Sequence, residues 1–111
     1  MPCHPLVIAS ELFREQFSRV LLRQRREAGL SQNGLAPRAA VSPHMIGYME
    51  KGVRCPKIDL CARTVLALGT LPSRFFAQME QEIGTDRLET MMVLAEGWGR
   101  GAMVPVTEDD R

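Results

Sequence analysis

The feature of this sequence that most constrains its fold is a succession of short apolar segments bounded by glycine, proline or serine. Within each segment apolar residues recur every three or four positions, which is the repeat of one face of an α-helix. Serine and proline are favoured where helices begin, and glycine where they end. Gly29, Gly52, Gly69 and Gly84 stand at such ends. No segment favours a strand, so the sequence predicts an all-α chain.

This punctuation divides the chain into three expected parts. Residues 1–10, with two prolines among the first five, are expected to be an irregular lead. Residues 11–83 are expected to form a five-helix domain whose first helix is capped by Ser10. Residues 84–111 form an acidic extension, with a possible helix over residues 86–96 and a loose end.

Two short helices are expected between Gly29 and Gly52. Ser31 is a suitable cap for the first of them, which is intrinsically weak. Pro37 costs about 3 kcal/mol in a helix interior, so this helix is expected to end or distort there. Ser42 and Pro43 begin the second helix, where the missing N–H of proline is no loss.

Two short helices joined by about four residues form the helix-turn-helix pattern. Over residues 17–76 the chain resembles the phage repressor and Cro-like (XRE-type) helix-turn-helix family. The residues that carry the resemblance are Leu21, Arg25, Gly29, Leu30, Ser31, Gln32, Leu35, Ala36, Val41, Ser42, Ile46, Glu50, Lys51, Gly52, Pro56, Leu68 and Gly69. No single residue is specific, and the resemblance rests on their order and spacing.

The resemblance implies a DNA-binding domain in which Arg25 and Glu50 pair to tie the first helix to the end of the third. Three residues depart from the family pattern. Ala40 stands where the turn usually has glycine, so it must adopt a left-handed conformation or the backbone must adjust. Pro37 replaces a polar residue, and Cys55 replaces an asparagine cap.

The family places base contacts on the outward face of the third helix. The corresponding residues are Ser42, Pro43, His44, Gly47 and Tyr48. Three of them have an alternative role: Ser42 as a helix cap, His44 as an exposed bystander, and Tyr48 as edge packing. Close approach to DNA is one reason for glycine at position 47. This face carries no Arg, Gln or Asn for bidentate base recognition, which favours readout of DNA shape.

Phosphate contacts are expected from polar residues flanking that helix, with Gln32 directing its amide and its helix N-terminus towards a phosphate. The candidates are Gln32, Arg38, Lys51, Arg54 and Lys57. Arg23 and Arg26 are equally compatible with a solvated helix face.

The net charge of +1 conceals an uneven distribution. Residues 1–76 contain 11 Lys/Arg against 5 Asp/Glu, a net of +6, whereas residues 77–111 contain 3 against 8, a net of −5. A basic body suggests a polyanionic partner.

These observations favour a transcriptional regulator, a repressor in particular, that binds a palindromic operator in double-stranded DNA as a homodimer. The expected dimer interface is the apolar set Phe75, Phe76, Met79, Ile83, Leu88, Met91, Met92 and Leu94, with core packing as the alternative for the two phenylalanines. The alternative function is the antitoxin of a toxin–antitoxin pair, whose C-terminal extension binds a partner protein.

An enzyme is not expected, because no paired carboxylates, phosphate loop or metal-spaced ligands are present. No cofactor or metal is implied. No apolar run reaches the roughly 18 residues of a membrane span, and three widely spaced cysteines do not suggest a disulfide framework, so a cytoplasmic protein without membrane association is expected.

Overall fold

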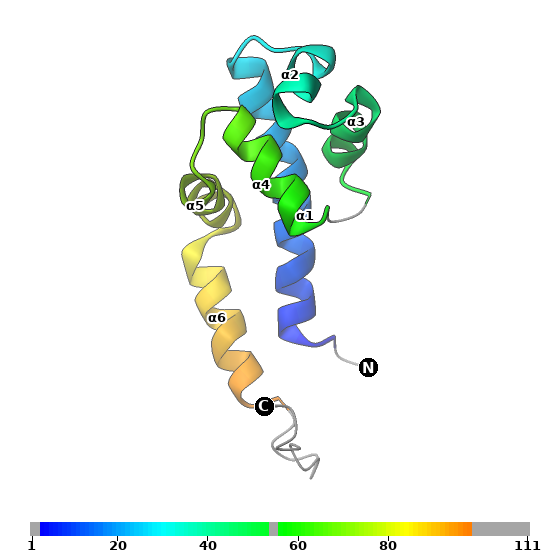
Figure 1. Cartoon of the computed structure of the whole chain (residues 1–111). Coiled ribbons are helices and arrows are strands. Elements are labelled where there is room, and N and C mark those ends of the chain that lie inside the picture. The colour runs from blue at the N-terminus through cyan, green and yellow to red at the C-terminus, as the bar shows by residue number, and fades with distance from the viewer. Residues whose placement is uncertain (1–2, 54–55, 99–111) are drawn as a thin grey trace.

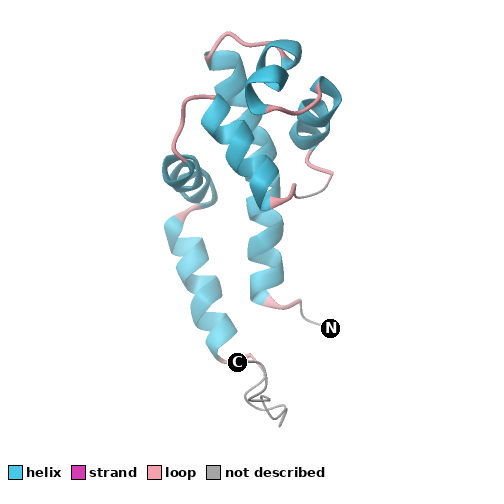
Figure 2. Cartoon of the chain, in the orientation of Figure 1, coloured by secondary structure: helices cyan, strands magenta, loops and turns pink. Residues whose placement is uncertain are grey.

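The computed structural model describes residues 3–53 and 56–98 of the chain (Figure 1). These residues form six α-helices and no strand (Figure 2). The helices are α1 (Pro5–Glu27), α2 (Gln32–Ala39), α3 (Pro43–Lys51), α4 (Ile58–Ala67), α5 (Pro72–Ile83) and α6 (Thr85–Glu96). The predicted all-α class is confirmed.

Helix α1 begins at Pro5, so the prediction of an irregular lead over residues 1–10 is wrong from that residue onward. The cap is His4, whose ring Nδ1 accepts a hydrogen bond from the Leu6 N–H at 3.0 Å. Pro5 occupies the first helical turn, where the missing N–H of proline costs no helical hydrogen bond. Ser10 lies inside the helix and donates to the Val7 carbonyl at 2.8 Å instead of capping.

The core lies where α1 meets the four helices that follow it. Its buried residues are Phe17, Val20 and Leu21 of α1, Leu35 and Ala36 of α2, Ile46 and Met49 of α3, Val65 of α4, and Phe75 and Met79 of α5. The rings of Phe17 and Phe75 lie 5.3 Å apart between centroids. Ala36 is fully buried, so a larger side chain there would push α2 away from its neighbours.

This core contains part of the predicted dimer interface. Phe75, Met79 and Ile83 are all less than 5% exposed within one chain, so these three residues are core and not available to a partner. The amphipathic repeat of α5 could not distinguish these roles, because a core face and an interface face have the same period. Phe76, in contrast, is 41% exposed.

Helix α2 continues through Pro37 to Ala39 and does not end at the proline. Leu35, Ala36 and Ala39 are buried, and the Arg63 Nε–H of α4 donates to the Ala39 carbonyl at 3.2 Å. Tertiary packing of this kind, more than intrinsic propensity, stabilises short helices.

Ala40 ends α2 in the left-handed region, with φ 58° and ψ 43°. It is the only non-glycine residue with positive φ among residues 3–53 and 56–98. The Val41 N–H donates to the Ala36 carbonyl at 3.0 Å, which closes the helix end. Of the two outcomes predicted for this turn, the structure therefore adopts the left-handed conformation at Ala40.

We predict that Ala40→Gly raises the free energy of unfolding by about 0.5–1 kcal/mol, because glycine adopts positive φ without a Cβ clash. Chemical denaturation measures the change. Ala28→Gly is the matched control, since Ala28 is also an exposed helix-end residue but has φ −78°. It should not be stabilised, and equal effects of the two changes would contradict the explanation.

Helix α6 lies beside the N-terminal half of α1, and together they project away from α2 and α3 (Figure 1). The helix predicted over residues 86–96 is present from Thr85 to Glu96. Trp98 was expected in a loose segment, yet its ring lies 4.9 Å from that of His4. The rest of the predicted loose end, residues 99–111, lies outside the described residues. Among the described helices, none is both long and apolar enough to cross a bilayer.

Candidate functional site

The start of α3 is fixed by its own sequence. Ser42 has extended backbone, and its Oγ accepts a hydrogen bond from the Met45 N–H at 3.1 Å. Ser42 therefore acts as the helix cap, and its contact with DNA stays a prediction. Pro43 follows in the first turn, and Ile46 and Met49 face the core. The opposite face of α3 is left for His44, Gly47 and Tyr48.

That opposite face forms one wall of an open hollow of about 410 Å³. The end of α1, the start of α2 and the outward side of α3 meet there. Its lining residues are Leu22, Arg25, Arg26, Gln32, Pro43, His44, Gly47, Tyr48, Glu50 and Lys51. The fold thus brings together four of the five predicted base-reading residues, two of the predicted phosphate contacts and the predicted structural pair.

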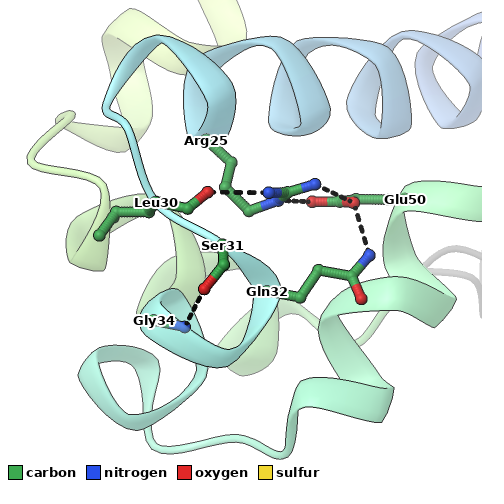
Figure 3. Close-up of polar contacts among 6 residues, drawn as sticks. All are labelled: Arg25, Leu30, Ser31, Gln32, Gly34 and Glu50. Carbon is green, nitrogen blue, oxygen red and sulfur yellow. Dashed lines mark hydrogen bonds and ion pairs between the residues drawn. The ribbon is translucent and has the colours of Figure 1, made fainter.

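Two of the lining residues, Arg25 and Glu50, form a bidentate ion pair (Figure 3). The Arg25 Nε donates to Glu50 Oε2 at 2.5 Å and Nη2 donates to Oε1 at 3.0 Å. The remaining Arg25 Nη1 donates to the Leu30 carbonyl at 2.8 Å. Both side chains are at least nine-tenths buried. The pairing that the family resemblance implied is present, and it also holds the loop between α1 and α2.

The hydrogen bond from Arg25 to Glu50 raises the pKa of the guanidinium above its ordinary value, against the lowering effect of burial, and the charge of Glu50 adds to the rise. Arg25 is therefore charged at neutral pH. The bidentate geometry suits a guanidinium and not an ammonium group.

Gln32 is placed differently from the prediction. Its side-chain Nε2 donates to Glu50 Oε1 at 3.0 Å, so the amide is directed to the ion pair instead of outward to a phosphate (Figure 3). The cause is the nearby carboxylate, a stronger acceptor than water for an amide N–H. The Ser31 Oγ meanwhile caps α2 by accepting from the Gly34 N–H at 2.9 Å.

The same amide lies beside Gly47. A Cβ built at position 47 would lie 3.4 Å from both Nε2 and Oε1 of Gln32, which is ordinary van der Waals contact. The Gln32 side chain therefore does not require glycine at this position, and close approach to DNA stays a prediction for it. Sequence spacing could not reveal this contact because it joins two different helices.

The other predicted phosphate contacts lie outside the hollow. Arg38 is exposed in the last turn of α2, and Lys57 is exposed at the start of α4. Arg54 lies outside the described residues. In contrast, Arg26 lines the hollow, although the sequence pattern did not distinguish a phosphate contact from a solvated helix face for this residue. Its position directly after Arg25 was the sequence signal that could have placed it in the hollow.

No family model matches the chain, and neither a curated protein nor a solved structure was found to be similar to it. Among the described residues no group of His, Cys, Asp and Glu is arranged to hold a metal ion.

We predict that Glu50→Ala lowers the free energy of unfolding by about 3–5 kcal/mol, because it leaves the buried Arg25 charge without its partner. Thermal and chemical denaturation measure the loss. Lys51→Ala, an exposed neighbour on the same helix, should change stability by less than about 0.5 kcal/mol. Equal melting of Glu50→Ala and the unaltered protein would contradict the role assigned to the pair.

The pH dependence of the pair follows from the direction of the Arg25 shift. A raised pKa means that the stabilisation is fully present below the ordinary arginine value and is lost only above it. The Arg25–Glu50 coupling energy from a double-mutant cycle should therefore be the same at about pH 7 and about pH 10. A decline over this interval would show that another group controls the pair.

Proposed function

We propose that this protein is a sequence-specific DNA-binding transcriptional regulator of the phage repressor and Cro-like type, acting as a repressor. In this proposal α2 and α3 are the helix-turn-helix and α3 enters the major groove. The observation that carries it is the hollow beside α3, which joins the outward residues of that helix to cationic side chains from α1 and α3.

The charges in the hollow support a polyanionic ligand. Arg25 is neutralised by Glu50, so the pair supplies structure and little net charge. Arg26 and Lys51 line the same hollow and form no ion pair with another described residue. Two uncompensated cations beside an exposed helix are suited to the phosphates that border a groove.

The dimensions of α3 also support this function. Nine residues give a helix roughly 14 Å long. An α-helix with its side chains is about 10–12 Å across, and the major groove of B-DNA is about 12 Å wide. Pro43 and His44 lie in the first turn of α3, from which recognition helices commonly contact base edges.

Base readout from this surface is limited to few hydrogen bonds. His44 is exposed and Tyr48 is half-buried, while Pro43 offers only apolar contact. The Gln32 amide is engaged by Glu50. We therefore propose that DNA shape and deformability contribute much of the specificity.

The proposal is tested by the salt dependence of DNA binding. Each phosphate contact contributes about 0.9 to the slope of log affinity against log salt concentration. Arg26→Ala and Lys51→Ala are each expected to reduce this slope by about 0.9, as measured by fluorescence anisotropy on a labelled duplex. Arg74→Ala is the control, because Arg74 is exposed on α5 and does not line the hollow. Equal slopes for all four proteins would exclude the hollow as the DNA interface.

Selection of bound sequences from random DNA provides a second test. A homodimer is expected to enrich a palindrome whose half-sites are about 10–10.5 base pairs apart. Recovery of a single, non-repeated half-site would contradict the dimeric arrangement while leaving DNA binding itself intact.

A further inference from the structure

The two-helix arm formed by residues 5–13 of α1 and by α6 lies at the end of the molecule opposite α2 and α3 (Figure 1). This arm leaves apolar side chains uncovered. None of the α6 residues is buried, although the helix is rich in methionine, leucine and valine. On α6 Met92, Val93 and Leu94 are more than half exposed, and Trp98 beyond it is 43% exposed. A helix that is exposed to water on all sides is normally polar, and so many apolar residues are unusual for it.

This apolar surface is divided between two faces of the arm. One face holds a groove of about 570 Å³ lined by Cys3, Pro5, Ile8, Asp86, Arg87, Thr90, Met91, Leu94 and Trp98. The other face holds a smaller hollow of about 320 Å³ lined by Leu6, Ala9, Phe13, Glu80, Thr85, Leu88, Glu89 and Met92. The two grooves differ in charge as well as in size.

Their charges determine which groove can bind a copy of itself. A two-fold interface brings the same patch of two chains together, so the patch must be self-complementary. The larger groove contains one acid and one base, Asp86 and Arg87, in its lining. The smaller hollow contains Glu80 and Glu89 and no cation, so two copies of it would repel each other.

We propose that the larger groove is the homodimer interface and that its occupant is the same groove of a second chain. Two α1–α6 arms would then form a four-helix bundle, with Ile8, Leu94 and Trp98 buried at its centre. Ile8 and the other N-terminal residues of this groove belong to the segment that the sequence pattern assigned to an irregular lead. The biological role of this dimer rests on the proposed function. Dimerisation itself can be tested without DNA.

The elongated shape of the described part of the chain fits this arrangement. It is 52 Å long and 25 to 30 Å across. A two-fold axis parallel to the long direction places both copies of α3 at the same end.

The larger groove also carries exposed apolar surface that such an interface would bury. Ile8, Leu94 and Trp98, which line this groove, are 40%, 57% and 43% exposed. They contribute part of the roughly 800 Å² that each partner buries in a stable interface.

Sedimentation velocity of the full chain without DNA tests the proposal. The unaltered protein should sediment as a dimer at micromolar concentration. Leu94→Glu should weaken the dimer at least roughly 30-fold, since it places a charge in the centre of the interface. Met92→Glu is the matched control, because Met92 lies two residues away on α6 with nearly the same exposure, 55% against 57%, but lines the opposite face. This variant should remain dimeric.

Three results would overturn the proposal: a monomeric unaltered protein, a dimeric Leu94→Glu, or a Met92→Glu that dissociates as readily as Leu94→Glu. Circular dichroism establishes that each variant retains its helices. Binding of monomeric Leu94→Glu to a single half-site, with the salt slope of the unaltered chain, separates failure of dimerisation from failure of DNA binding. If the dimer is as expected but no protein binds DNA, the interface stands and the proposed function does not.

Discussion

The bidentate ion pair between Arg25 and Glu50 connects every element that forms the candidate interface. Arg25 comes from α1 and Glu50 from the end of α3, while the Leu30 carbonyl and the Gln32 amide bring in the loop and the start of α2. Because the pair is largely buried, neither charge is tolerated without the other. The outward face of α3 therefore has a defined position relative to the cations of α1.

A second consequence of this pair is the division of polar side chains between structure and binding. Arg25 and Gln32 both line the hollow, yet their donors are directed to Glu50 and Leu30. Arg26 and Lys51 remain for a ligand. A polar residue on a candidate binding surface is thus not necessarily a binding residue, because its donors can instead satisfy acceptors within the protein.

The arm of α1 and α6 presents the opposite situation, in which apolar groups lack a partner within one chain. Phe75 and Met79 of α5 are covered by α1, whereas Met92 and Leu94 of α6 are not. The difference arises because α5 packs on the core and α6 contacts mainly the N-terminal half of α1. A chain with two exposed apolar grooves at one end and a polar hollow at the other is suited to joining copies at one end and binding a ligand at the other.

The sequence by itself determined the all-α class, the cap at Ser42, the left-handed ends at Gly29 and Gly52, and the approximate bounds of α3 and α6. These features depend on a few neighbouring residues and on the helical repeat, which are local. The tertiary structure alone decided that α2 continues through Pro37 and that Gln32 lies over Gly47. It also decided that Phe75, Met79 and Ile83 of α5 are core, whereas no residue of α6 is buried. Each of these outcomes depends on contacts between residues distant in the chain, whose energies outweigh local propensity and leave no periodic signal in the sequence.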